Sequence, residues 1–248
     1  MKKILLILAI ALPFVFISCK DDKDEPTTPD NHEYVDLGLP SGTLWATCNV
    51  GANSPEEYGD HFAWGETEPK ESYDCTNYKW AYWERVAISD HYYQVNVTWY
   101  KYYFKDWIDN AYVEGDGKPE LYPEDDAAYV NWGPKWRMPS LEQLQELLEY
   151  CSWKWTQRNG VNGHLVTGPN GKTIFLPAAG GRSEKQLYFD GDDAYYWTRT
   201  LCNPDKLTIE VADQEMAYIL HFSSFEWDVW YDIRYDGCTV RAVRASKK

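Results

Sequence analysis

The chain has 248 residues and a formal net charge of −15, from 24 basic and 39 acidic side chains. Such an excess of negative charge repels phosphate backbones and anionic lipid headgroups, so it argues against nucleic-acid binding and electrostatic attachment to a membrane. Aromatic residues make up 17% of the chain, with 13 Trp and 20 Tyr, and this content argues against disorder.

The first residues have the layout of a secretory signal. Two lysines follow Met1, and the apolar run 4–17 is shorter than the roughly 20 residues that a membrane-spanning helix needs. Ser18-Cys19 then resembles the bacterial lipobox, which implies removal of residues 1–18 and lipidation of Cys19 with a diacylglyceryl group. The alternative is an ordinary cleaved signal that happens to contain a cysteine.

Residues 19–33 are expected to form a disordered, lipidated tether. The stretch 20–30 has two prolines, many charges and no apolar residue to bury. Its Cys-Lys-Asp-Asp start resembles the acidic signal that directs Bacteroidota lipoproteins to the outer face of the outer membrane. We therefore expect a lipoprotein that faces the cell exterior, and a periplasmic orientation is the alternative.

The first part of the chain beyond the tether predicts short strands and loops. Tyr34–Val50 is typical of two strands joined by a turn at 40–42, and 61–64 of another short strand. Residues 70–112 are crowded with aromatics that follow no clean period, which predicts a long, ordered but irregular excursion. A loop is expected over 114–123.

Two helices are predicted next. Acidic residues 124–126 precede a short apolar segment at 127–130, where they suit the positive end of a helix. Ser140 and Gln143 form a capping-box pattern at the start of the stronger helix. An apolar stripe at helical spacing follows: Leu141, Leu144, Leu147, Leu148 and Cys151.

The remaining elements predict strands. Residues 164–167 and 172–176 flank Gly168-Pro169-Asn170-Gly171, which is typical of a hairpin. Late strands are expected at 195–198, 216–222 and 239–244. The order of elements predicts one α+β domain over 34–248.

The chain shows little that is typical of catalysis. Five histidines are scattered, and neither H-E-x-x-H nor G-x-S-x-G occurs. Besides Cys19 the cysteines are odd in number and include no C-x-x-C, so at least one is free or pairs between chains: Cys48, Cys75, Cys151, Cys202 and Cys238. Cys48 and Cys151 are expected to be buried apolar residues, and His221 a pocket-wall or core residue. We expect no enzyme activity.

Blocks spread across residues 34–244 resemble, in order, the Fibrobacter succinogenes major paralogous domain. The blocks are Tyr34–Gly42, Leu44–Ala52, Trp64–Thr67, Pro123–Ala128, Trp136–Ser140, Ile174–Gly180, Tyr196–Trp197 and Val240–Arg241. The resemblance implies a surface lipoprotein with a fold similar to C-type lectin-like domains and the formylglycine-generating enzyme. That fold implies paired N- and C-terminal strands, one or two helices on a small twisted sheet, and long loops. None of the cysteines lies in a stretch that matches the enzyme's site.

Sugar-binding C-type lectins hold their sugars through a calcium ion. Two segments of this chain resemble the calcium-binding motifs of those lectins only distantly. Asn203-Pro204-Asp205 and Glu226-Trp227-Asp228 have ligands or order that differ from the lectin pattern. The turn Asp190–Asp193 is rich in oxygen ligands. Solvated acidic turns are the favoured interpretation, and we expect no metal or cofactor.

In folds of this class the late loops and strands form the ligand surface. Aromatic anchors mixed with charged groups are typical of binding surfaces, and nine residues are therefore candidates for ligand binding: Trp197, Arg199, Trp227, Asp228, Trp230, Tyr231, Arg234, Tyr235 and Asp236. The alternative is a structural role, in which about half of these aromatic residues belong to the core. The sequence predicts a non-catalytic module for a glycan or protein at the cell surface. The alternatives are an assembly subunit of a surface complex and an enzyme of the formylglycine-generating type.

Overall fold

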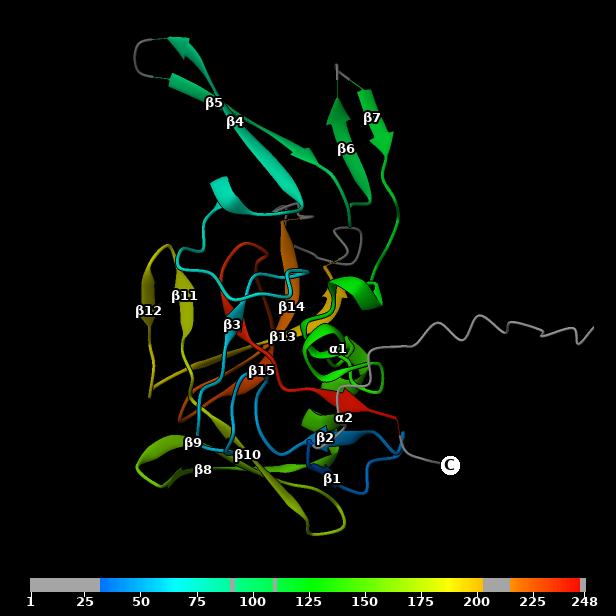
Figure 1. Cartoon of the computed structure of the whole chain (residues 1–248), viewed down its shortest axis with the longest axis vertical. Coiled ribbons are helices and arrows are strands. Elements are labelled where there is room, and N and C mark those ends of the chain that lie inside the picture. Colours follow the sequence, from blue (N-terminus) through cyan, green and yellow to red (C-terminus); the bar gives the residue numbers. More distant parts are fainter. Residues whose placement is uncertain (1–31, 90–91, 109–110, 203–214, 246–248) are drawn as a thin grey trace, which may run out of the picture.

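The computed structural model describes residues 32–89, 92–108, 111–202 and 215–245, and it is strand-rich and α+β in class. Its largest sheet has five strands in the order β15-β14-β13-β16-β3 (Figure 1). Their bounds are β3 His61–Phe62, β13 Ala194–Leu201, β14 Met216–Phe222, β15 Trp227–Ile233 and β16 Cys238–Thr239. The neighbours are antiparallel except β13 and β16, which are parallel.

A second sheet joins the two ends of the described chain. It has the order β1-β2-β17, from β1 Tyr34–Asp36, β2 Leu44–Ala46 and β17 Val243–Arg244. The predicted strand–turn–strand of 34–50 is confirmed, as is the pairing of N- and C-terminal strands. The strand predicted at 239–244 is wrong as one element, because it divides into β16 and β17 in different sheets.

A three-stranded sheet contains the predicted hairpin. It comprises β8 Ser152–Arg158, β9 Val161–Thr167 and β10 Thr173–Pro177, all antiparallel. The turn between β9 and β10 confirms the prediction, whereas β8 was not predicted. A small hairpin of β11 Gly181–Ser183 and β12 Gln186–Tyr188 follows.

Two α-helices occur in the described ranges, α1 Ala127–Trp132 and α2 Leu141–Tyr150, together with the 3-10 turns Cys75–Asn77 and Pro123–Asp125. Asp126 begins α1 and accepts hydrogen bonds from the backbone N–H groups of Ala128, Tyr129 and Met138. Burial raises its pKa to about 6. The predicted acidic start of this helix is confirmed, and the helix is two residues longer than expected.

The capping box of α2 is also confirmed. The Gln143 backbone N–H donates to Ser140 Oγ at 3.2 Å, and the Ser140 N–H donates to Gln143 Oε1 at 2.9 Å. The apolar stripe of the helix packs against β13, β14 and β15. The cap therefore fixes the start of a helix that covers one face of the large sheet.

Replacing Ser140 with alanine should lower the free energy of unfolding by about 1 kcal/mol, because a backbone N–H of the first turn loses its acceptor. For a chain of this size the melting temperature should fall by roughly 2–4 °C. Ser152→Ala, at an exposed position at the start of β8, is the control. Equal melting of the two variants would contradict a stabilising role for the cap.

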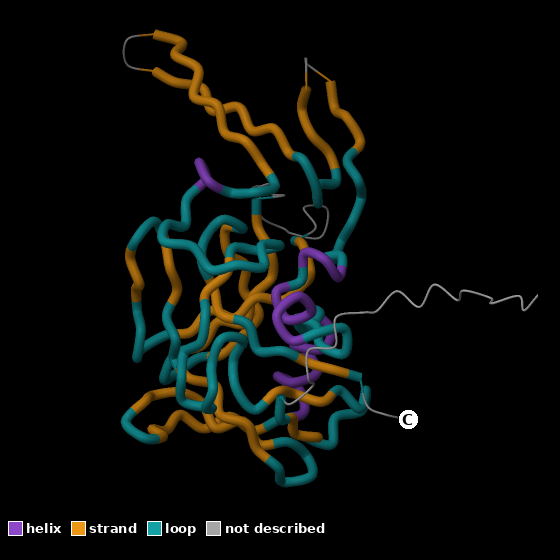
Figure 2. Tube along the Cα trace, in the orientation of Figure 1, coloured by secondary structure: helices purple, strands orange, loops and turns teal. Residues whose placement is uncertain are grey.

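The segment 70–112 was predicted to be irregular, and this is wrong. It contains two antiparallel hairpins, β4 Ala81–Ser89 with β5 Tyr92–Trp99, and β6 Lys105–Ile108 with β7 Ala111–Glu114. Both extend from one end of the molecule, far from β8–β10 (Figures 1 and 2). Apolar residues occupy both faces of the β4–β5 hairpin, so the alternation that signals a half-buried strand is absent.

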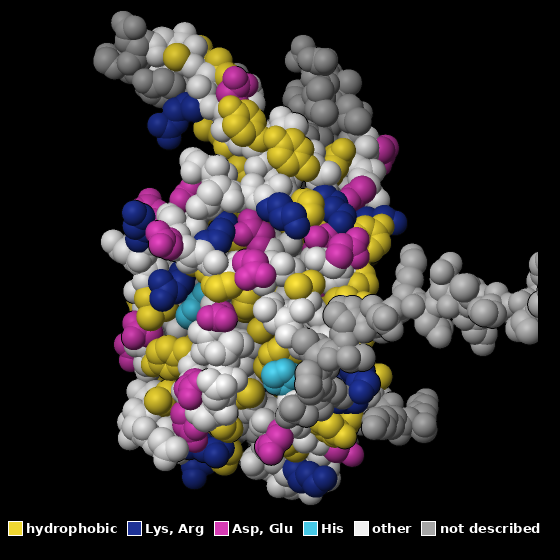
Figure 3. Space-filling model, in the orientation of Figure 1, with side chains coloured by type: hydrophobic (Ala, Val, Ile, Leu, Met, Phe, Trp, Pro, Cys, Tyr) yellow, Lys and Arg dark blue, Asp and Glu magenta, His cyan; other side chains and the backbone are white. Residues whose placement is uncertain are grey.

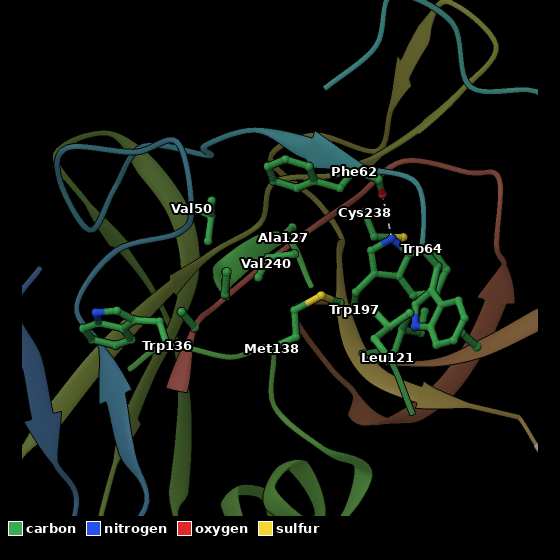
Figure 4. Close-up of a cluster of buried hydrophobic side chains, with 14 of the residues drawn as sticks. Val50, Phe62, Trp64, Leu121, Ala127, Trp136, Met138, Trp197, Cys238 and Val240 are labelled. Atoms are coloured by element: carbon green, nitrogen blue, oxygen red, sulfur yellow. Dashed lines mark hydrogen bonds between the residues drawn. The ribbon is translucent and has the colours of Figure 1, made fainter. Parts of the chain in front are cut away.

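The core lies on both faces of the five-stranded sheet. One buried cluster contains Trp197 and Ile219, and a second contains Tyr196 and Leu220. Successive residues of a strand point to opposite faces, so the two clusters lie on opposite sides of β13 and β14. In the first cluster the Trp197 indole N–H donates to the Phe62 carbonyl at 2.7 Å (Figure 4).

The predicted signal of residues 1–18, Cys19 and residues 20–31 of the tether lie outside the described residues. Within the ranges that the structure describes, none of the helices has the length and apolar character needed to cross a membrane.

Candidate functional site

The structure divides the nine predicted ligand-binding residues into three groups. Trp227, Asp228 and Trp230 are exposed, and Tyr231 and Tyr235 are half-buried. Arg199 is half-buried and lies elsewhere, beside Glu120 and the start of α2. The remaining three are buried: Trp197, Arg234 and Asp236.

The three buried residues need a correction, because they offer no surface to a ligand. Trp197 is fully buried and its indole N–H is used by Phe62. Arg234 is also fully buried, and its guanidinium donates to the Tyr78 hydroxyl at 2.9 Å. Asp236 is only 8% exposed. The sequence pattern mixed interior and surface residues because aromatic and charged side chains serve in both places here.

Trp227 and Trp230 do not share one face. They are three positions apart on β15, and side chains alternate along a strand, so they point to opposite sides of the sheet. Trp227 pairs across the ladder with Phe222 and stacks on Trp153, with ring centroids 6.2 Å apart. Trp230 pairs with Ile219 and lies on the other side.

Trp230 ends a continuous row of rings, which we call the aromatic ladder: Phe189, Tyr188, Tyr195, His221 and Trp230. Their successive centroid separations are 5.5, 5.5, 5.0 and 4.7 Å. β12, the turn after it, β13, β14 and β15 each supply one ring. The two end rings are exposed, Phe189 at 58% and Trp230 at 50%, whereas His221 between them is buried. The ladder therefore has a fixed centre and two accessible ends.

Carboxylates border the ladder. The Tyr195 hydroxyl donates to Asp193 Oδ2 at 3.4 Å, and His221 Nε2 lies 3.8 Å from the same oxygen. Glu226 Oε1 lies 3.9 Å from His221 Nδ1, a buried nitrogen with no hydrogen-bond partner. Asp228 lies directly across from His221 in the strand register. Burial, and then the charge of Asp193, raise the pKa of Tyr195, so its hydroxyl stays neutral and can donate.

An acidic pair, the half-buried Asp232 and the buried Asp236, lies close to the inner rings. Burial raises the pKa of Asp232 to about 6, and burial together with the charge of Asp232 raises the pKa of Asp236 to about 7. The Cys238 thiol donates to Asp232 Oδ2 at 3.6 Å. Burial raises the pKa of Cys238, which keeps it a thiol, whereas nucleophilic cysteines have lowered values.

In the described part of the chain, no group of three or more His, Cys, Asp or Glu side chains is placed to hold a metal ion. Two segments distantly resemble the calcium motifs of lectins. Asn203-Pro204-Asp205 lies outside the described residues, and Glu226 and Asp228 of the other segment flank the ladder. Five cysteines are described and all are free thiols, with Cys48 buried as predicted and Cys151 half-buried.

The ladder can offer flat apolar faces, a neutral hydroxyl donor and carboxylate acceptors side by side. Of its five rings the sequence singled out Trp230, placed Tyr195 in a predicted late strand, and gave His221 a pocket-wall or core position. Tyr188 and Phe189 were missed, and the only sequence signal was their position just before the acidic turn Asp190–Asp193. Comparisons with family models, curated proteins and solved structures gave no match for this chain.

Proposed function

We propose that the chain is a non-catalytic binding module and that the aromatic ladder recognises a carbohydrate. The observation that carries this proposal is the exposure of Phe189 and Trp230 at the two ends of one row of rings bordered by carboxylates. Rigid aromatic faces supply contact area at little conformational cost. A sugar ring has an apolar face for such stacking and hydroxyls that donate to Asp193, Glu226 and Asp228.

The proposal extends to the setting of the domain. The motifs that resemble the Fibrobacter succinogenes major paralogous domain support a C-type lectin-like fold, and the paired terminal strands agree with it. A lipid on Cys19 would hold the module at the outer membrane, facing the exterior. A chain with a net charge of −15 is repelled by anionic lipid headgroups, so attachment to the membrane would depend on the covalent lipid and not on electrostatic attraction.

The test is a glycan array probed with the purified protein, followed by titration of each bound glycan. Trp230→Ala should weaken binding at least about tenfold, because it removes an exposed stacking face worth about 1.4 kcal/mol or more. Trp227→Ala is the matched control. It removes a tryptophan of similar exposure from the same strand, on the opposite side of the sheet.

Equal loss in the two variants would contradict the assignment to the ladder. Binding on a parallel protein array, with none on the glycan array, would indicate a protein ligand instead of a glycan. Absence of binding on both arrays would contradict the proposed binding function.

A second candidate function, an assembly subunit, rests on the β4–β5 hairpin. This hairpin stands away from the body (Figure 3). Its exposed apolar side chains include Tyr82, Ile88, Tyr92 and Val95. Its two strands carry one Glu and one Arg, so a second copy would meet no local repulsion despite the acidic chain. A two-stranded hairpin is marginal alone and gains from such pairing. Native mass spectrometry of detergent-extracted protein tests this, and a monomer alone would rule it out.

A further inference from the structure

A cleft of about 420 Å³ lies next to the start of α2, and its lining is dominated by positive charge. Its walls include Lys135, Arg137, Arg199 and Arg244 against one acid, Glu120. None of the ladder residues lines it. We propose that this cleft is a second binding site, for a small anion bearing a carboxylate or phosphate group.

The charge of the cleft contrasts with the rest of the chain. Four cations and one carboxylate line it, whereas the whole sequence has a net charge of −15. A polyanion that spreads over the surface would meet strong repulsion, whereas a small anion needs only the local field of the cleft. The volume lies within the range of about 300–1,000 Å³ that is usual for small-ligand sites.

Arg199 forms a fixed wall of the cleft. Its Nε donates to Glu120 Oε2 at 2.9 Å, and its Nη1 donates to the Met138 carbonyl at 2.9 Å and to Gln143 Oε1 at 3.1 Å. Glu120 therefore neutralises this cation already. The other three basic side chains in the lining are Lys135, Arg137 and Arg244.

Arg137 and Arg244 are held by aromatic rings. The Arg137 guanidinium carbon lies 3.9 Å from the centroid of Tyr129, and that of Arg244 lies 4.8 Å from Tyr34 and 5.3 Å from Trp136. The backbone of Arg137 also pairs with Val243 through two hydrogen bonds. Guanidinium groups fixed in this way lose little conformational freedom when a ligand binds, which favours affinity.

One nitrogen of Arg137 is buried and unsatisfied. Burial raises the pKa of Asp126 and the charge of Arg137 partly offsets this rise, but in the part of the chain that the structure describes no carboxylate lies within ion-pair distance of Arg137, and its Nη1 has no hydrogen-bond partner. A planar guanidinium matches a carboxylate or phosphate with two parallel N–H···O bonds. An oxyanion in the cleft would supply the missing partner after a small adjustment of this side chain.

The experiment titrates the protein with two probes, citrate and inorganic phosphate, by isothermal calorimetry in 150 mM sodium chloride. We expect saturable binding of at least one probe with one site per chain. Arg137→Gln should weaken it at least tenfold. Lys172→Gln removes an exposed cation from the turn between β9 and β10, and it should leave binding unchanged.

Binding of phosphate alone would indicate a phosphate-bearing ligand, and binding of citrate alone a carboxylate. Lys135→Gln, at an exposed position, gives a second test if Arg137→Gln melts at a lower temperature than the parent protein, and it should weaken binding at least threefold. Absence of saturable binding, or an equal loss in Lys172→Gln, would overturn the proposal. Glycan binding at the ladder is measured separately, so neither result decides the other.

Discussion

Replacing Arg234 with methionine is expected to lower the free energy of unfolding by about 3–5 kcal/mol, because buried acceptors lose their donors. The side chain is fully buried. It donates to the Tyr78 hydroxyl and the Tyr102 carbonyl, each at 2.9 Å, and to the Lys101 carbonyl at 3.3 Å. Methionine fills part of the space but donates to none of them. Roughly 6–20 °C should be lost from the melting temperature.

The position of Arg234 explains why the effect should be large. Its guanidinium carbon lies 4.9 Å from the ring centroid of Trp64 and 4.6 Å from that of Trp99. Trp64 belongs to the main core, whereas Trp99 ends β5. One cation therefore fastens the base of the β4–β5 hairpin to the end of β15, and its loss should loosen both.

Chemical denaturation monitored by tryptophan fluorescence measures the change. Arg158→Met is the matched control, since it removes an exposed arginine. Its ion-pair partner Glu56 is buried but keeps a hydrogen bond from the Asn159 side-chain amide at 3.2 Å, so this variant should destabilise less than Arg234→Met. Arg234→Lys keeps the charge but not the forked donors, so it should also destabilise. Unfolding of Arg234→Met at the same denaturant concentration as Arg158→Met would refute the fastening role.

The elements that the sequence predicted well are those with local signals. The helix α2 begins at Ser140 because the capping box uses residues three apart, and its stripe needs no partner to be recognised. The β9–β10 hairpin is set by Pro169, Asn170 and Gly171 in its turn. In both cases the information lies within a few consecutive residues.

The hairpins of 81–114 lacked such a signal. Trp83 and Val97 pair on one face of β4–β5, and the exposed Tyr82 and Ile88 are apolar as well. The alternation of polar and apolar residues that identifies a half-buried strand is therefore absent from the sequence of this hairpin. The rings that pack at its base meet residues more than a hundred positions away, as Trp83 meets Tyr235 at 5.5 Å. Periodicity within one segment does not encode such contacts.

The candidate site was predictable only in part, for the same reason. Aromatic content indicated β15 as a binding strand, but strand register decides which residues reach the surface. Trp227 and Trp230 lie on opposite sides only once 227–233 is recognised as a strand. The ladder also needs Tyr188, which reaches Tyr195 from a separate hairpin. Arg234 looked like a specificity contact, and its burial follows from rings contributed by distant segments.

The half-buried Asp232 and the buried Asp236 together predict an unusual dependence of stability on pH. Burial and the charge of Asp232 raise the pKa of Asp236 to about 7 in the folded protein, against about 3.9 in the unfolded chain. Between these values the folded state binds more protons than the unfolded state. The contribution of this group to stability is therefore largest below about pH 4, falls as the pH rises to about 7, and is constant above.

Asp236→Asn should remove this loss, because the amide fills the same space without a charge. The difference in unfolding free energy between the variant and the parent should grow by at most about 1.4 kcal/mol per pH unit and reach about 2–4 kcal/mol at pH 8. Asp190→Asn removes one negative charge from an exposed turn and is the control for net charge. Urea unfolding at pH 5, 6, 7 and 8 measures each difference.

The slope of the Asp236→Asn difference against pH separates electrostatic from packing effects. A lost or gained contact shifts stability equally at every pH, whereas a raised pKa makes the difference grow until about pH 7 and then level off. A constant difference would contradict the raised pKa of Asp236. Growth matched by Asp190→Asn would assign the effect to the net charge of −15 and not to the pair. If the difference in unfolding free energy grows with pH for Asp236→Asn alone, then burial and the neighbouring charge of Asp232 disfavour ionisation of Asp236 at neutral pH.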